Sequence, residues 1–489
     1  MWGRIIDLQV TSLDLPGDNL GLENIFASLR HLPYATLLLS GGSLDSSRFS
    51  LMGWDPFLVI HAKGRKIAVH FQKDRRTFQA NPLNVLDEAL EALALPGPAP
   101  VLPLSAGAMG FLAYDLKNQL ERLPTTAVDD LNLPDMVWSF PRQIVVHDRW
   151  EKRFWQVEVA YEPPAGCSQE KKSASALFQS ESISSLGGYQ VGELKSTFGR
   201  QEYLQAVRRA REYIRQGDIY QVNLSQRFSF PFTGEFYRLF LQLFQRNPAP
   251  FYAYLNCGNF QILSTSMERF LLRRGDYLET RPIKGTRPRG RTPDEDEVMA
   301  QELRTSPKEA AELSMIVDLL RNDLGRVCLG GSVKVREHKR LEAYENVFHL
   351  VSIVTGQLRS DCRQGEILRA TFPGGSITGC PKIRAMEIID ELEPVVRHVY
   401  CGSIGYLGLH RNLDLNIAIR TAIGSQGQVH FAVGGGIVYD SEEVAEYEET
   451  LHKGMTLFKV IGQGGLAPED APVCAAEIDP PKNRRNLAG

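Results

Sequence analysis

Residues 281–290 read RPIKGTRPRG, and this stretch decides how the rest of the sequence is interpreted. It places Lys284 beside Gly285 on a tight backbone, among arginines that carry the same charge. Neighbouring cations and partial burial both disfavour the ammonium form, so the pattern predicts a lysine that can act as a nucleophile. Taken alone, the stretch is also compatible with a solvated basic turn, or with a phosphate or nucleic-acid patch.

The composition is that of a soluble globular protein with one large or two medium cores. The chain has 489 residues, 43% hydrophobic and 23% charged, and a formal net charge of −3. This charge predicts no general attraction to nucleic acid or to anionic membranes. The N-terminal sequence lacks signal-peptide features, and no apolar run approaches the ~20 residues of a membrane span. We therefore expect a cytoplasmic protein.

The cysteines indicate reduced thiols. There are seven of them, scattered along the chain without any CxxC spacing. An odd number without this spacing argues against a disulfide framework and against a structural zinc site.

The chain divides by composition into four parts. Residues 1–162 are an N-terminal region of short strands and turns, with one helical stretch at residues 86–95. Residues 163–190 are rich in Pro, Gly, Ser, Glu and Lys, as in a linker or a mobile loop. Helical and strand-like segments alternate in residues 191–462, the expected catalytic domain. Residues 463–489 are predicted to be a disordered tail.

Two helical segments place pairs of carboxylates at the spacing of a metal site. KEAAELSMIVDLLRNDLG, residues 308–325, has Glu309 and Glu312 one helical turn apart. DSEEVAEYEETLHKG, residues 440–454, repeats this arrangement with Glu446, Glu449 and Lys453.

In the second segment Asp440 and Glu443 form a possible capping box at the start of the helix. Two carboxylate pairs that face each other would suit Mg²⁺, which takes one or two carboxylates and keeps room for waters and an acidic substrate. Glutamate pairs are also common on solvated helices, where they stabilise the helix weakly.

Several further segments contain groups that bind anions. FPGGSITGCPK, residues 372–382, and FAVGGGIVYD, residues 431–440, are candidate carboxylate cradles or plain glycine turns. Neither matches a nucleotide-binding pattern. Arg420 ends an apolar run, so it needs an anionic partner, either a ligand or an internal Asp. His349, alone in an apolar strand, has the pattern of a satisfied core residue.

Together these segments resemble the chorismate-utilising enzymes. The resemblance covers residues 201–462 and is carried by RPIKGTRPRG, DLLRNDLG, FPGGSITGCPK, YCGSIGY, IAIRT and GGGIVYDSEEVAEYEETLHK, in the family's order. The N-terminal region is similar more weakly, through LLLSGGS and RFSLMGWDP. The resemblance implies an α+β fold in which two large antiparallel sheets pack face to face with helices outside.

Three positions discriminate within the family. Isochorismate and salicylate synthases carry a water-activating lysine where this chain has Gln221, so ammonia is the expected nucleophile. Anthranilate synthases typically have alanine where this chain has Lys284, and lysine there resembles the aminodeoxychorismate synthases. Anthranilate synthases often read LLES as part of a tryptophan feedback site, where this chain has Leu39 before Ser40, so the sequence leaves tryptophan feedback open.

The resemblance also implies roles for individual residues. The expected catalytic residues are Lys284, Glu268, His349 and Thr286. The expected substrate-binding residues are Arg420, Tyr400, Gly434, Gly435, Gly436, Lys453, Ser376 and Gln221. The expected Mg²⁺ ligands are Glu312 and Glu449, with Glu309 and Glu446 assisting. The family has serine-proline before the catalytic glutamate, where this chain reads Ser266-Met267, so the geometry of that loop is open.

By this resemblance, the substrate is chorismate and the product is 4-amino-4-deoxychorismate, formed through a covalent Lys284 adduct. Ammonia is expected from a separate glutamine amidotransferase subunit, because no cysteine here lies in a glycine-flanked elbow. The nearest alternative is anthranilate synthesis. A non-catalytic protein that binds anions or nucleic acid through residues 281–291 is the alternative from a different class, and we expect no nucleic-acid or membrane partner.

Overall fold

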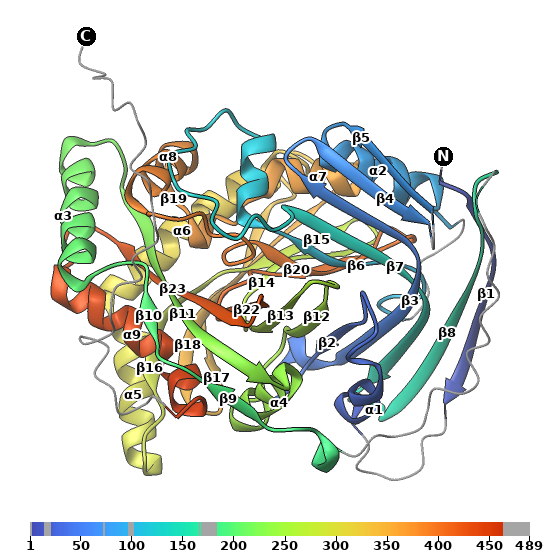
Figure 1. The fold of residues 1–489 in the computed structure, drawn as a ribbon. Coiled ribbons are helices and arrows are strands. Elements are labelled where there is room, and N and C mark those ends of the chain that lie inside the picture. Colours follow the sequence, from blue (N-terminus) through green and yellow to red (C-terminus); the bar gives the residue numbers. More distant parts are fainter. Residues whose placement is uncertain are drawn as a thin grey trace.

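The fold is α+β, with an extensive antiparallel sheet system in the interior and helices outside it (Figure 1). The computed structural model describes residues 2–13, 21–71, 74–95, 102–165, 167 and 183–462. Much of the expected linker and the whole of the expected tail, residues 463–489, lie outside these described residues. No helix in the described ranges is both long and apolar enough to cross a membrane.

Two long strands form the centre of the sheet system. Strand β3 (Phe49–Lys63) pairs antiparallel with β7 (Met136–Asp148) along almost its whole length. Both strands are almost continuously buried, as expected for strands that are covered on both faces. Further strands flank this pair: β4 (Lys66–Phe71), β5 (Asp74–Gln79), β8 (Arg153–Glu162) and β1 (Arg4–Leu13).

Two branches of strands extend from this central pair. The first branch begins at β3 and runs through β2 (Thr36–Leu39), β12 (Tyr252–Asn256), β13 (Phe260–Thr265), β22 (Thr421–Ser425), β23 (Gln428–Ile437) and β11 (Gln221–Gly234). Short strands border β11: β9 (Tyr189–Val191), β10 (Lys195–Ser196) and β19 (Gly379–Cys380).

The second branch begins at β7. It runs through β6 (Gly107–Leu112), β20 (Ser403–Gly408), β21 (Leu413–Asn416), β14 (Arg269–Arg274), β15 (Tyr277–Arg281) and β18 (Val347–Gln357). Strands β16 (Ile283–Pro288) and β17 (Lys334–Ala343) also pair with β18. One continuous apolar cluster contains buried side chains of both branches, so the two expected sheets share a core and are joined through β3 and β7.

Strands from the N-terminal region lie inside both branches. Strand β2 pairs with β12, and β6 pairs with β20. The division at residues 163–190 is therefore a boundary in the sequence, and the strands on either side of it share hydrogen bonds.

Two short crossovers connect the branches directly. Residues 266–268 join β13 to β14, and residues 417–420 join β21 to β22. The crossovers are hydrogen-bonded to each other, because the Ile417 amide donates to the Glu268 carbonyl oxygen at 3.0 Å and the Ser266 hydroxyl donates to the Ile417 carbonyl oxygen at 2.6 Å. Residues of these crossovers therefore lie between the two branches.

The helices follow the periodicity of the sequence. They are α1 (Leu22–Leu29), α2 (Pro82–Ala92), α3 (Arg200–Gln216), α4 (Phe236–Arg246), α5 (Pro293–Thr305), α6 (Pro307–Gly325), α7 (Gln364–Thr371), α8 (Lys382–Leu392) and α9 (Glu443–Val460). Helix α6 packs on β18 and β16, and α9 packs on β23. Helix α6 starts at Pro307, with the Ser306 hydroxyl accepting from the Glu309 amide.

The expected capping box of α9 is wrong. The N-cap is Glu442, without a side-chain cap bond. The Ser441 hydroxyl instead accepts from the Val438 amide at 3.0 Å, which fixes the turn that precedes the helix.

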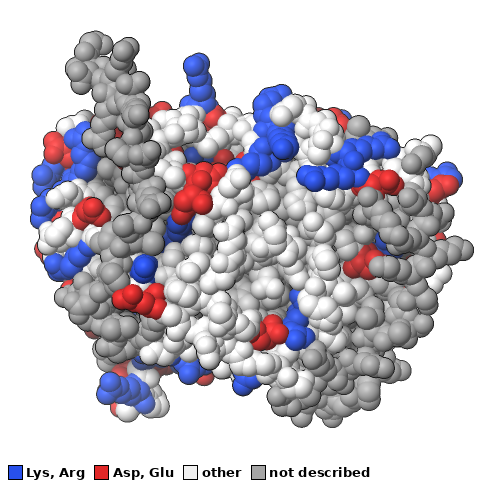
Figure 2. Space-filling model, in the orientation of Figure 1, with Lys and Arg blue, Asp and Glu red and all other residues white. Residues whose placement is uncertain are grey.

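Charge does not concentrate on the face shown in Figure 2. Basic and acidic side chains there are intermixed and lie mainly around a broad uncharged middle. This distribution gives no continuous basic surface on that face of the kind that nucleic-acid binding requires.

Candidate active site

Lys284 lies on a bulged strand at the end of the second branch. In β16, Lys284 opposes Leu350 and Thr286 opposes His349, and the register shifts between them at Gly285. Gly285 has a φ of +73°, and a Cβ there would lie 2.8 Å from Leu303 Cδ1 and 3.1 Å from Glu309 Oε2. Only glycine suits this bulge, so the glycine beside the lysine has a steric reason.

The Lys284 amine reaches across to the first branch. A Cβ placed on Gly436 of β23 would lie 3.2 Å from Lys284 Nζ. The amine makes no hydrogen bond or ion pair within the described residues. It therefore lies between the two branches without a fixed partner.

The pKa of Lys284 is lowered as expected, but the neighbouring arginines do not lower it. Burial lowers the pKa of the amine and Lys453 lowers it further, which outweighs the opposing effect of carboxylates that include Glu312 and Glu268. The arginines of residues 281–290 are not the cause, because each pairs with an acid: Arg281 with Asp45 and Glu279, Arg287 with Glu302 and Glu309, and Arg289 with Asp296. The depressed pKa is thus due to burial and to a lysine of α9.

Glu268 lies buried in the crossover at residues 266–268, with 4% of its surface exposed. Its Oε1 accepts a hydrogen bond from the Ser376 hydroxyl. Burial raises the pKa of this carboxyl to about 7, although the Ser376 hydrogen bond, Lys284 and the Ile283 backbone each act to lower it. A carboxyl that titrates near neutral pH can donate a proton at physiological pH.

His349 is neutral and has one ring nitrogen free. Burial, assisted by Arg420 and Lys453, lowers its pKa to about 3. Nδ1 lies 3.0 Å from the Gly285 carbonyl oxygen, which can only accept, so Nδ1 carries the hydrogen and also lies 3.1 Å from Thr286 Oγ1. Nε2 is buried without a partner among the described groups. His349 is therefore only half satisfied, and Nε2 is available to accept a hydrogen bond from a ligand.

Arg420 occupies the second crossover, with a φ of +51°. Burial lowers the pKa of the guanidinium, against the opposing effect of Tyr252 and Tyr344. In the part of the chain that the structure describes, no carboxylate pairs with this side chain. No aspartate of the described residues is thus its partner, and the guanidinium is available to an anionic ligand.

Tyr400 and Ser376 lie beside the two crossovers. Tyr400 is buried next to Cys401, whose amide donates to the Ala418 carbonyl oxygen at 2.9 Å. Burial raises the pKa of the Tyr400 phenol, and the nearby charges of Arg397 and Glu393 act on this pKa in opposite directions. Ser376 contacts Glu268, so in this structure it positions the acid, in addition to any contact with substrate.

The predicted carboxylates of α6 and α9 flank the Lys284 amine. The charges of Glu312 and Glu449 both act to raise the pKa of the Lys284 amine. Burial raises the pKa of Glu312, and the neighbouring charges of Glu309 and Glu449 also act to raise it. Burial opposes the ionised form of Glu449, but Lys453 at 2.6 Å and other lysines lower its pKa overall. A Cβ placed on Gly435 of β23 would lie 3.3 Å from Glu446 Oε2 and 3.5 Å from Glu449 Oε1.

The carboxylates meet the needs of Mg²⁺ only in part. Among the described residues, no three His, Cys, Asp or Glu side chains form a group that could hold a metal ion by themselves. Mg²⁺ usually takes only one or two protein carboxylates and completes its shell with water and substrate. Glu446 Oε2 is buried without a partner, and burial raises the pKa of Glu446. The unpartnered Glu446 oxygen fits a divalent cation, whereas Glu449 is paired with Lys453 and Glu309 with Arg287 in this structure.

The remaining predicted residues also gather here. Lys453 Nζ donates to the Gly434 carbonyl oxygen at 3.0 Å, which ties α9 to the glycine strand. Gln221 is fully buried in β11. Sequence reasoning missed Asn223, which opposes Gly436, and Tyr344, whose ring lies edge-on to His349 with centroids 5.3 Å apart. The spacing of Asn223, two residues after Gln221 in a strand, could have identified it.

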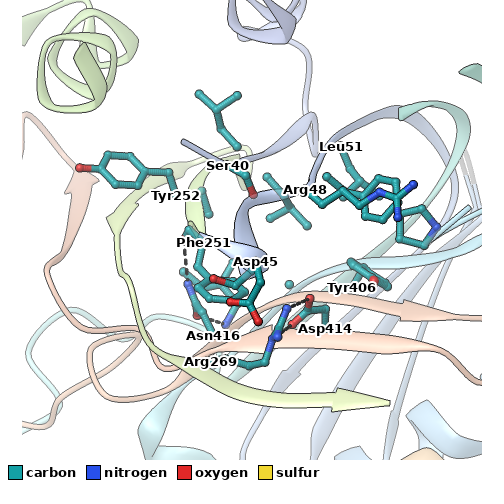
Figure 3. A pocket seen from close by; sticks show the side chains of 18 of the residues that line it. Ser40, Asp45, Arg48, Leu51, Phe251, Tyr252, Arg269, Tyr406, Asp414 and Asn416 are labelled. Atoms are coloured by element: carbon teal, nitrogen blue, oxygen red, sulfur yellow. Dashed lines mark hydrogen bonds and ion pairs between the residues drawn. The ribbon is translucent and has the colours of Figure 1, made fainter. Parts of the chain in front are cut away.

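A cavity lies around Ser40 and Asp45 (Figure 3). Leu39 and Ser40 line it, so the segment compared above with LLES forms one of its walls. Arg269 spans its floor and binds Asp414 with both oxygens within 3.0 Å. None of the predicted catalytic residues lines this cavity.

Comparison with known proteins gives one consistent result. The family described as chorismate binding enzyme matches residues 38–459. Aminodeoxychorismate synthase component 1 of Escherichia coli (strain K12) is 42% identical over 88% of this chain and 94% of its own length. The protein of the same name from Bacillus subtilis (strain 168) is 36% identical over 86% of this chain and 90% of its own.

Anthranilate synthases are also similar. Component 1 from Thermus thermophilus is 38% identical over 88% of this chain and 92% of its own. The solved structure of component I from Streptococcus pneumoniae TIGR4 superposes with a TM-score of 0.72 at 30% identity, covering 91% of this chain and 99% of that one. This structure confirms the expected fold class.

Proposed function

Because the chain belongs to the family of chorismate binding enzymes, we propose that it converts chorismate and ammonia to 4-amino-4-deoxychorismate. The observation that carries this proposal is the free, pKa-depressed amine of Lys284 between the carboxylates of α6 and α9 and the acid Glu268. The similarity to proteins named aminodeoxychorismate synthase component 1 supports it.

Chorismate carries two carboxylates that need different partners. We assign the enolpyruvyl carboxylate to Arg420, whose guanidinium has no internal carboxylate among the described residues. A contact of Tyr400 with the same carboxylate is what the family resemblance implies. The ring carboxylate would lie towards Lys453 and the glycine strand at Gly434, Gly435 and Gly436. A Mg²⁺ ion held by Glu312 and Glu449, with Glu309 and Glu446 assisting, would neutralise it and polarise the conjugated ring.

In the first half of the reaction the Lys284 amine attacks ring carbon C2. The C4 hydroxyl leaves as water, with the proton supplied by Glu268, whose pKa of about 7 leaves it partly protonated at neutral pH. His349 Nε2, a buried acceptor without a partner among the described groups, can accept the hydrogen of that hydroxyl and orient it. Thr286, beside His349 Nδ1, would help to fix the ring.

In the second half, ammonia attacks C4 and Lys284 is expelled from C2 as the double bonds shift back. Two allylic displacements thus replace one difficult substitution. The ammonia would come from a glutamine amidotransferase partner, in keeping with the component 1 name of the relatives.

Five thiols of the described residues are poorly suited to the chemistry of a glutamine amidotransferase. A glutamine amidotransferase uses a reactive thiolate, whereas burial raises the pKa of the described thiols for which a shift is resolved: Cys257, Cys328, Cys362, Cys380 and Cys401.

One product assay tests the proposal. Purified protein with chorismate, Mg²⁺ and ammonium, examined by mass spectrometry, should yield 4-amino-4-deoxychorismate without release of pyruvate. Fluorescent ortho-aminobenzoate with stoichiometric pyruvate would show anthranilate synthesis instead. Lack of any turnover, with salt-dependent binding of nucleic acid, would favour the non-catalytic alternative, although the pairing of the arginines at residues 281–290 argues against it.

A further inference from the structure

Two of the sequence motifs meet at an ion pair that has no role in the steps above. Lys382 is the last residue of FPGGSITGCPK and the first residue of α8, and Asp323 lies in DLLRNDLG near the end of α6. Lys382 Nζ lies 2.6 Å from Asp323 Oδ2, and the two side chains are only 14% and 5% exposed. The Lys382 ammonium therefore already has a carboxylate partner and is not free for a carboxylate of the substrate.

Lys382 also closes the loop that carries Ser376. Its Nζ donates to the carbonyl oxygen of Thr371, the last residue of α7, at 3.0 Å. Thr371 and Lys382 border residues 372–381, so one ammonium joins the two ends of this loop. Asp323 fixes the junction to α6. Ser376 lies near the middle of the loop that is closed in this way.

The loop is packed closely on two sides. A Cβ placed on Gly375 would lie 2.6 Å from Cδ2 of Leu319, which precedes Asp323 by one turn of α6. A Cβ placed on Gly374 would lie 2.5 Å from Ile417 Cδ1, in the second crossover. The two glycines thus let the loop approach both α6 and the crossover. The position of Ser376 therefore depends on how the loop is anchored to α6.

Ser376 is the contact between this loop and the expected proton donor. Its hydroxyl donates to Glu268 Oε1, and this hydrogen bond acts to lower the pKa of the carboxyl against the effect of burial. The other groups that interact electrostatically with this carboxyl are Lys284, the Ile283 backbone, Tyr344 and Cys401. Within the described residues, neither Asp323 nor Lys382 acts on this pKa directly. Any effect of the ion pair on Glu268 must therefore pass through the loop.

We propose that the Asp323–Lys382 ion pair positions the active site, by holding the loop of residues 372–381 so that Ser376 stays hydrogen-bonded to Glu268. This inference rests on the proposed function, in which Glu268 is the proton donor. A pair that served only stability would change the free energy of unfolding and leave the proton affinity of Glu268 as it is. The titration of Glu268 therefore distinguishes the two roles.

The double variant Asp323→Leu/Lys382→Met tests the proposal. It leaves the net charge unchanged and leaves no buried charge without a partner. Difference infrared spectroscopy follows the band of the protonated Glu268 carboxyl, which is identified by its absence from Glu268→Gln. In the wild type this band should disappear with a midpoint at about pH 7. In the double variant the midpoint should rise by about one pH unit, because the carboxylate loses a hydrogen bond.

The rate of Lys284 adduct formation gives a second readout. Glu268 must be protonated to act as an acid, so the rate should fall as the pH rises through its pKa. In the double variant this fall should move to higher pH by the same amount as the infrared midpoint.

Two further variants separate the route through Ser376 from other effects. Ser376→Ala should raise the midpoint by a similar amount, and the double change should add nothing in that background, because both act on the same hydrogen bond. Asp318→Leu/Arg321→Met is the matched control, because this exposed ion pair of 3.0 Å lies on the same helix; the midpoint should not change. If the double variant fails to fold, Lys382→Gln should show a rise that Ser376→Ala likewise abolishes.

Other outcomes would overturn the inference. An unchanged midpoint in a folded double variant would show that the pair serves only stability. A shift that adds fully to that of Ser376→Ala would show that the pair acts on Glu268 by another route. A wild-type protein that makes no 4-amino-4-deoxychorismate, while the midpoints shift as expected, would contradict the proposed function and leave the positioning of Ser376 in place.

Discussion

Replacing Glu268 by Gln should stabilise the protein at alkaline pH while removing its activity. Burial raises the pKa of this carboxyl from 4.5 to about 7. At about 1.4 kcal/mol for each tenfold change in proton affinity, this difference corresponds to about 3 kcal/mol. Because the pKa is raised in the folded state, its contribution to stability is present below pH 4.5 and is lost as the pH rises through about 7. The wild type therefore loses about 3 kcal/mol over this range.

Glutamine occupies the same space and can still accept from the Ser376 hydroxyl, but it does not ionise. The difference in free energy of unfolding between Glu268→Gln and the wild type should thus have its starting value at pH 4.5. It should shift in favour of the variant by up to about 3 kcal/mol by pH 8. Urea denaturation of both proteins across this range measures the difference. Turnover should fall by about 10²–10⁴, the usual contribution of a general acid.

A difference in stability that does not vary with pH would show that Glu268 titrates normally. Its assignment as the proton donor would then lose its basis. Ser376→Ala provides a second check, because loss of a hydrogen bond to the carboxylate should raise the pKa of Glu268 further.

Three further predictions concern the amine, the guanidinium and the carboxylates. Lys284→Ala should abolish amination at saturating ammonium while chorismate binding, measured by calorimetry, survives; full product formation by this variant would exclude an essential lysine. Arg420→Lys should raise the KM for chorismate by about ten- to a hundredfold, because a single ammonium replaces a bidentate partner, and an unchanged KM would place the enolpyruvyl carboxylate elsewhere. Excess EDTA should abolish activity, and added Mg²⁺ should restore it in the wild type but poorly in Glu312→Gln; undiminished activity in EDTA would exclude a metal at Glu312 and Glu449. 

The helices of the site could be predicted from the sequence because their chemistry is local. The one-turn spacing of Glu309 and Glu312 fixes their common direction once residues 307–325 form a helix, and α6 confirms that helix. The capping box predicted at Asp440 does not form, because a hydrogen bond from the Val438 amide to the Ser441 hydroxyl fixes the preceding turn instead. Local patterns thus located the elements better than their ends.

The environment of the site depends on contacts between distant strands, which no local pattern contains. The charges that act on Lys284 come from α6, α9 and the crossover at residues 266–268, whereas its sequence neighbours are already paired. The half-satisfied state of His349 likewise depends on a bulge at Gly285, which supplies the acceptor for Nδ1. Asn223 lies opposite Gly436 only through the pairing of β11 with β23.

The formation of a bond between Lys284 and carbon during turnover is the most direct test of the account. Intact-protein mass spectrometry after rapid quenching, with chorismate and Mg²⁺ but no ammonium, should reveal a species heavier by one chorismate less one water. Peptide mapping should place the added mass on Lys284, and ammonium should discharge it as 4-amino-4-deoxychorismate. An enzyme that makes this product at full rate while its mass never changes would contradict the account.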